Sequence, residues 1–179
     1  MSDRKPLQTS AMTAREAIET AGEQLDRVLA NFARVDAKVS SLFAVNAGML
    51  AVLALNVKPP DLKFTQLAVL GALCVCCICG SLWFLYRASH PILKRTSTTL
   101  LFFQDIARTP EDDYVAQMRR CDDREYFDQL TQQIWRNSTI LSQKFECLKT
   151  AFLFTASAAP FWFAALAMAA SVHAEISLK

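Results

Sequence analysis

The sequence predicts an all-α membrane protein with three transmembrane helices and a cytoplasmic helical stalk. Three stretches of the 179-residue chain carry no charged residue, and helical heptad spacing marks the segments that precede two of them. Only 4 Gly and 6 Pro interrupt the chain. Hydrophobic residues make up 53% and charged residues 20%, a balance that favours helices in and beside a bilayer over a loop-rich fold.

Residues 1–39 predict a cytoplasmic amphipathic helix. Thr13 and Glu16 have the spacing of a capping box, in which the two side chains bond the free amides of the first turn. A heptad stripe then continues into the first uncharged stretch, so a single helix from about Met12 to Val57 is expected, roughly 70 Å long. The stripe comprises Ile18, Ala21, Leu25, Val28, Phe32, Val35, Val39, Leu42 and Asn46.

The uncharged stretches are residues 40–57, 66–86 and 150–172, which are 18, 21 and 23 residues long. A helix needs about 17–25 apolar residues to cross the hydrocarbon core. Between the first two stretches, Pro59 and Pro60 stop the helix and turn the chain. The three stretches are therefore predicted to span the membrane, the first two as a tight hairpin.

The distribution of Lys and Arg predicts the orientation. Residues 1–39 hold six of these cations and residues 87–149 hold ten, whereas the hairpin loop holds two and the tail 173–179 only Lys179. Short loops rich in Lys and Arg stay in the cytoplasm. The N-terminus and the helical segment 87–149 are therefore predicted to be cytoplasmic, and the short tail 173–179 external.

Two helix starts are readable in the segment 87–149. Thr109 is expected to cap a short helix with Pro110 at its first position. Asp122, with Glu125 three residues on, is expected to cap the helix that leads into the last span. Its apolar face comprises Phe127, Leu130, Ile134, Leu141, Phe145 and Leu148. We expect this helix to form an antiparallel bundle with the N-terminal helix, although heptads do not separate packing within one chain from packing between chains.

The cysteines indicate packing. Cys74, Cys76, Cys77 and Cys79 lie in one apolar run without His, Asp or Glu nearby. A metal cluster or acylation is an alternative, but free cysteine behaves as a small hydrophobic residue.

No motif for catalysis is visible. The chain has no Gly-rich phosphate loop and no His-Glu-x-x-His metal motif, so neither an enzyme nor a cofactor or metal site is expected. A net charge of +2 is too small to indicate nucleic acid.

Five polar residues form a candidate ligand site. Most polar side chains of this kind face solvent or pack within a stalk, and these five are open to the same interpretation. The alternative is a site for a small anionic ligand, whose phosphate requires cations. The candidates are Asp36, Lys38, Asp105, Asn137 and Lys144.

Three segments resemble the transmembrane effectors of Pycsar anti-phage systems, and the resemblance extends from about residue 30 to residue 154. Residues 34–46 (RVDAKVSSLFAVN) resemble that family's Asp-x-Lys approach to the first span. Residues 101–107 (LFFQDIA), followed by the acidic run EDDY at 111–114, resemble its central aromatic-Asp motif, although Gln104 stands where a small residue is expected. Residues of the last cytoplasmic helix match as well: Gln132, Gln133, Ile134, Asn137, Lys144 and Leu148.

The resemblance implies a function that periodicity does not show. In that family a companion cyclase makes cCMP or cUMP on phage infection, without needing to contact the effector. The effector senses this cyclic pyrimidine mononucleotide and impairs the bacterial inner membrane, and it catalyses no reaction. The cytoplasmic helices are the expected sensor because the messenger is soluble and anionic.

Rival functions are a non-toxic helical membrane scaffold and a gated channel with a housekeeping role. A homo-oligomer is also expected, because the 18-residue first span with Asn46 and the long heptad helix leave surface that a single chain covers poorly. The oligomer number, and the choice between a pore and general bilayer disruption, stay open at this point.

Overall fold

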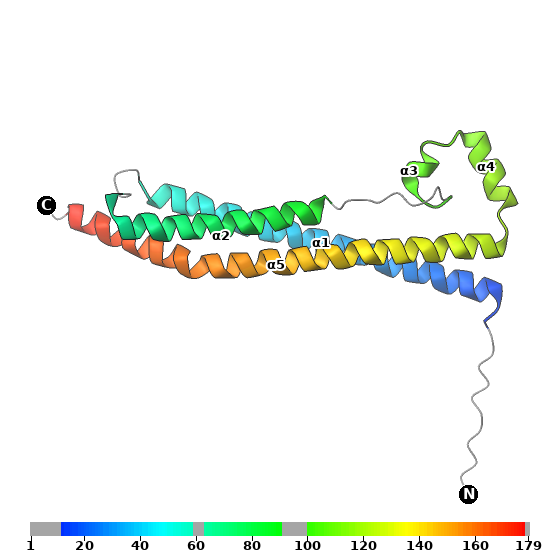
Figure 1. Ribbon diagram of the computed structural model, residues 1–179, viewed down its shortest axis with the longest axis horizontal. Helices are drawn as coiled ribbons and strands as arrows, with labels where there is room; N and C mark the ends of the chain where they lie inside the picture. Colours follow the sequence, from blue (N-terminus) through cyan, green and yellow to red (C-terminus); the bar gives the residue numbers. More distant parts are fainter. Residues whose placement is uncertain (1–11, 59–62, 91–99, 178–179) are drawn as a thin grey trace, which may run out of the picture. The chain divides into compact units, whose positions relative to one another are not determined.

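The computed structural model of the chain describes residues 12–58, 63–90 and 100–177, and within these ranges it forms helices and no strand. The all-α prediction is thereby confirmed. The predicted turn at Pro59 and Pro60 lies outside the described residues. In chain order the helices are α1 (Ala14–Asn56), α2 (Thr65–Ser89), α3 (Phe103–Ile106), α4 (Glu111–Arg120) and α5 (Asp123–Ser177) (Figure 1).

The chain divides into two units that share two long helices. The first unit contains Met1–Ala30 and Lys94–Thr139, and the second contains Asn31–Leu93 and Ile140–Lys179. Helices α1 and α5 contribute residues to both units, whereas α2 belongs to the second alone. In agreement with the sequence, α1, α2 and α5 are each long and apolar enough to cross a membrane.

The start of α1 confirms the predicted capping box. The backbone N–H of Thr13 donates to the Glu16 carboxylate at 2.9 Å, and the N–H of Glu16 donates to the Thr13 hydroxyl at 3.4 Å. The pKa of Glu16 is held below its usual range, mainly by the bond from the Thr13 amide and to a smaller extent by the bond with the Thr13 side chain. All nine residues of the predicted heptad stripe are buried or half-buried, which confirms the inward face of α1.

The two later helix starts differ from each other. Asp122 caps α5 as predicted, because its carboxylate accepts the N–H of Glu125 at 2.7 Å. The predicted cap of α4 is wrong: Pro110 occupies the N-cap position and no side chain bonds the first turn. Thr109 instead turns back, and its hydroxyl donates to the carbonyl of Asp105 at 2.9 Å.

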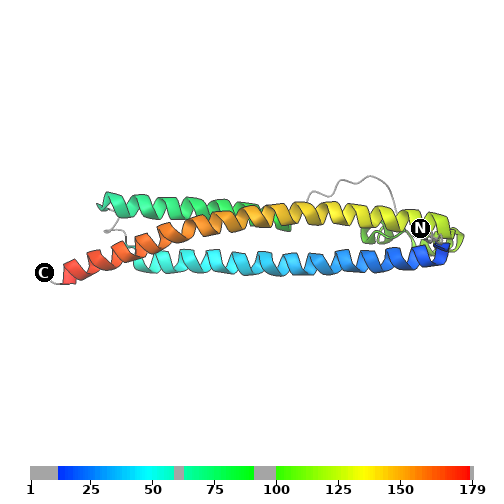
Figure 2. The same cartoon turned by 90° about the horizontal axis from the view of Figure 1, so that it is seen from below.

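In the second unit α1 and α5 run parallel, and α2 runs antiparallel to α5 (Figures 1 and 2). Along the α1–α5 contact the paired residue numbers rise together: Asp36 bonds Lys144, and Met49 bonds Trp162. The expected antiparallel pairing of these two helices is therefore wrong. The reason is that each continues from a charged segment into an apolar span in the same direction along the chain.

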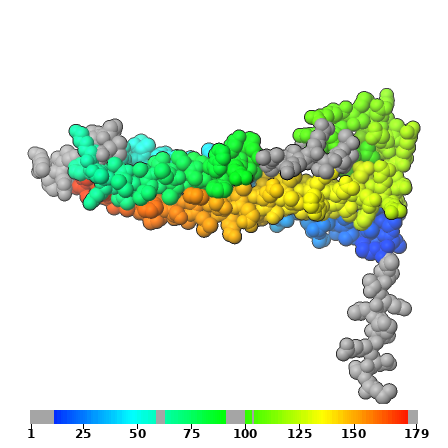
Figure 3. All heavy atoms as spheres, in the orientation of Figure 1, coloured from blue at the N-terminus to red at the C-terminus, as the bar shows by residue number. Residues whose placement is uncertain are grey.

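The core of the second unit is built from small residues on α5. Its inward face carries Ala151, Ala158, Ala165 and Ala169, none more than 1% exposed, and small residues let neighbouring helices approach closely. In the space-filling view α2 and the orange part of α5 lie against each other (Figure 3). The last three of these alanines form one buried cluster with Leu53, Leu67, Cys74 and Ile78.

One glycine of α2 leaves room for a side chain of α5. A Cβ added at Gly80 would lie 2.8 Å from the ring of Phe154. That ring also stacks on Phe84, with centroids 5.7 Å apart. Glycine at position 80 therefore leaves the space that the Phe154 ring occupies.

The cysteine run divides between the core and the surface. Cys74 is fully buried and Cys77 half-buried against the core, as the packing interpretation predicts, but Cys76 and Cys79 are exposed. In the part of the chain that the structure describes, no group of three His, Cys, Asp or Glu side chains could hold a metal.

Candidate functional site

A part-buried ion pair joins α1 to α5 in the second unit. The ammonium of Lys144 lies 2.6 Å from a carboxylate oxygen of Asp36. It also lies 5.4 Å from the centre of the Phe32 ring, within the range of a cation–π interaction. Lys144 is only 8% exposed, whereas the Asp36 side chain stays 55% exposed. A buried cation is thus neutralised by a carboxylate that still reaches solvent.

The spacing of α5 explains why a lysine is buried at this position. Leu141, Lys144, Leu148 and Ala151 are all buried or half-buried and follow one another at steps of three and four residues, so Lys144 stands on the inward stripe. Phe145 was predicted on this face, but it is 44% exposed. Because Asp36 pairs with Lys144, the lysine takes the inward position and the neighbouring Phe145 faces outward.

A polar layer lies farther along the same helices, inside the predicted spans. It consists of one residue from each helix, Asn46 of α1, Ser81 of α2 and Thr155 of α5, none more than 9% exposed. The amide nitrogen of Asn46 donates to the hydroxyls of Ser81 at 3.1 Å and Thr155 at 3.0 Å. The two hydroxyls are 2.9 Å apart. Every member of the layer is therefore bonded to both others.

The polar layer changes the argument for a homo-oligomer. Asn46 was expected to expose polar surface within a short span, but it is completely buried and satisfied within one chain. The heptad stripe of α1 is covered as well. Neither feature now calls for a second copy, because both find partners inside the chain, and the homo-oligomer stays a prediction.

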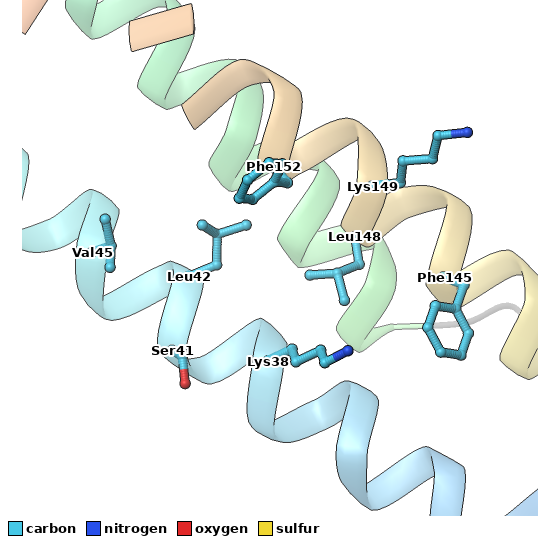
Figure 4. A pocket seen from close by; sticks show the side chains of 8 residues that line it. All are labelled: Lys38, Ser41, Leu42, Val45, Phe145, Leu148, Lys149 and Phe152. Carbon is cyan, nitrogen blue, oxygen red and sulfur yellow. The ribbon is translucent and has the colours of Figure 1, made fainter. Parts of the chain in front are cut away.

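The five candidate residues are divided between the two units, and their joint role as a ligand site stays a prediction. The structure brings together Asp36 and Lys144. Lys38 is exposed on α1 and lines a groove of about 560 Å³ beside α5 (Figure 4). Asp105, which is 6% exposed, and Asn137, which is half-buried, belong to the first unit.

Sequence reasoning missed Ser81, Thr155 and Gln129. The side-chain oxygen of Gln129 accepts the N–H of Leu100 at 2.9 Å and so holds the backbone at Leu100 against α5. Thr155 could have been found, since it lies eleven residues after Lys144 and therefore on the same helix face. Ser81 was recognisable only as a polar residue inside an apolar span.

The structure defines a class of protein: a helical membrane protein in which charged segments continue without a break into apolar helices that enclose a polar layer. A family model narrows this class. The Pycsar effector protein domain matches residues 20–171, and the chain belongs to this family. The match confirms the resemblance found in the sequence and supports a role in anti-phage defence. No curated protein and no solved structure matches the chain.

Proposed function

We propose that this chain is the membrane effector of a cyclic-nucleotide-signalled anti-phage defence system. In this proposal it senses a cyclic pyrimidine mononucleotide, cCMP or cUMP, made by a companion cyclase that it need not contact. It then impairs the inner membrane, and growth of the infected cell stops without any reaction catalysed by the effector. Membership of the Pycsar effector family carries the proposal.

The Asp36–Lys144 pair is the best-supported place for the nucleotide to act. A cyclic mononucleotide carries a phosphodiester anion, and its phosphate competes with the Asp36 carboxylate for the ammonium of Lys144. Both residues lie on helices that continue to the polar layer at Asn46 and Thr155. A change in the ion pair is thereby linked to the spans through unbroken helix. The nucleotide shifts the protein only as far as its affinities for the two states differ.

Lys144→Ala tests this assignment. Loss of a charge-assisted hydrogen bond, worth about 1.5–3 kcal/mol, predicts a roughly ten- to hundredfold loss of nucleotide sensitivity. The measurement is dye release from liposomes that contain the purified protein, against cCMP and cUMP concentration. Arg124→Ala, which removes an exposed cation from the same helix, should leave the dose response unchanged.

Two outcomes would contradict the proposal at different levels. An unchanged response for alanine at Asp36, Lys38, Asp105, Asn137 and Lys144 would place the sensor elsewhere in the chain. If wild-type protein responds to neither nucleotide, in liposomes or in growing cells, then cCMP and cUMP are not its activating ligands. A protein that is harmless with and without nucleotide would favour the scaffold.

The proposed orientation places the N-terminus in the cytoplasm and the C-terminus outside, because sixteen of the nineteen basic residues flank the spans on one side. Reporter fusions at Met1 and Thr109 should give a cytoplasmic signal, and fusions at Pro60 and Lys179 a periplasmic one. A cytoplasmic signal at Lys179 would contradict the three-span topology.

A further inference from the structure

The groove between α1 and α5 combines an apolar floor with two cations. Four residues from each helix line it, at positions i, i+3, i+4 and i+7, so each wall is one face of a helix. Its volume of about 560 Å³ lies within the roughly 300–1,000 Å³ of small-molecule sites. The lining consists of Lys38, Ser41, Leu42, Val45, Phe145, Leu148, Lys149 and Phe152 (Figure 4).

The groove lies on the side of α5 that faces away from α2. Phe154 points toward α2, where it stacks on Phe84. Phe152 stands two residues earlier, about 200° around a helix from Phe154 at 100° per residue, and it is 60% exposed. Helix α2 therefore leaves this side of the α1–α5 pair open.

The two lysines of the groove lack the neutralisation that Lys144 has. Lys38 and Lys149 are exposed, and neither forms an ion pair with a residue that the structure describes. No acidic side chain lines the groove. Figure 4 shows the Lys38 ammonium between α1 and α5, whereas the Lys149 side chain extends from α5 away from α1. The two lysines are the last basic residue before the first predicted span and the last before the third, a level at which lysines reach lipid headgroups.

We propose that this groove binds an anionic phospholipid. The Lys38 ammonium binds the headgroup phosphate, the flexible Lys149 side chain turns toward the same headgroup, and an acyl chain lies over Leu42, Val45 and Phe152. Basic pockets between transmembrane helices on the cytoplasmic side are a known setting for anionic headgroups. Lys38 belongs to the Asp-x-Lys segment and is a candidate for the nucleotide site, whereas Lys149 and Phe152 belong to no motif found in the sequence.

The charges favour a lipid over the other occupants. An apolar helix from a second copy would bury two lysines without a carboxylate, and burial of an unpaired charge is strongly unfavourable. A free cyclic nucleotide would meet the lysines but has no tail for the surface formed by Val45 and Phe152. An anionic lipid satisfies both halves of the groove.

Native mass spectrometry of the full chain tests the proposal, with phosphatidylglycerol and phosphatidylcholine of identical acyl chains supplied together. Wild-type protein should retain phosphatidylglycerol about 10- to 30-fold more strongly, as expected for two lysines near an anionic headgroup. The Lys38→Ala/Lys149→Ala variant should lose this preference to within about twofold. The Lys63→Ala/Arg87→Ala variant removes two exposed cations outside the groove and should keep it.

A photo-crosslinking amino acid at position 45 identifies the occupant in membranes. The expected product is the chain carrying one phospholipid, and added cCMP should not reduce its yield. A covalent dimer would overturn the proposal in favour of a second copy. Equal retention of the two lipids by wild type, or an unchanged preference after loss of both lysines, would overturn it as well.

Discussion

Asp36→Asn is expected to destabilise the protein more than Lys144→Met, although Asp36 is the more exposed partner. The first change leaves the buried Lys144 ammonium without its carboxylate, whereas the second removes the buried charge itself. Because Asp36→Asn leaves a buried charge without its partner, it should lower the free energy of unfolding by about 2–3 kcal/mol. Lys144→Met replaces the lysine by an apolar side chain of similar length, so it should change the free energy of unfolding by no more than about 1 kcal/mol. The free energy of unfolding is measured by titrating SDS into the protein in mild detergent, with circular dichroism as the signal for unfolding.

The double variant separates the pair from its surroundings. Asp36→Asn/Lys144→Met should recover most of the stability that Asp36→Asn loses, because no unpaired ammonium is left. Additive losses from the two single changes would show that the 2.6 Å contact contributes no coupling. Glu23→Gln provides the matched control, since its partner Arg27 is 71% exposed and such surface pairs contribute little.

The same variants should move the nucleotide response in opposite directions. Under the proposed function, Asp36→Asn removes the anion that competes for Lys144 and lowers the nucleotide concentration required. Lys144→Met removes the cation and raises it. A shift in the same direction for both would mean that Asp36 contacts the nucleotide or that the pair acts only in folding.

The helices and their inward faces were predictable because they depend on local spacing. Val35, Val39 and Asn46 are buried as the heptad stripe of α1 requires. The spacing identifies a face, but it carries no information about the direction of the neighbouring helix. The parallel course of α1 and α5 follows instead from the predicted topology, in which both helices enter the membrane from the cytoplasm, and the expected antiparallel bundle conflicted with that topology.

The ion pair was not predictable because its partners are remote in the sequence. Asp36 and Lys144 are separated by 108 residues, and the apolar pattern of α5 favoured Phe145 for the inward face. The polar layer was not predictable for the same reason, since Ser81 and Thr155 are 74 residues apart in the sequence. Such pairs are defined by the register between helices, which tertiary packing sets.

Asn46→Leu is expected to weaken the packing of the three spans by about 1–3 kcal/mol. The change keeps the side-chain size but removes the bonds from Asn46 to Ser81 and Thr155, each worth about 0.6–2 kcal/mol between helices in a membrane. The loss should be limited to these bonds, because the two hydroxyls stay within bonding distance of each other.

Asn56→Leu is the matched control for this prediction. Asn46 also donates to the carbonyl of Leu42, four residues back, at 2.8 Å. Asn56 lies on the same helix and donates in the same way to the carbonyl of Val52, but it is exposed and bonds no other helix among the described residues. Its replacement should change the free energy of unfolding by no more than about 0.5 kcal/mol. A double-mutant cycle of Asn46→Leu with Thr155→Val should give a coupling of about 0.6–2 kcal/mol. Equal effects of the two asparagine variants, or a coupling near zero, would show that the polar layer does not hold α1 to α2 and α5.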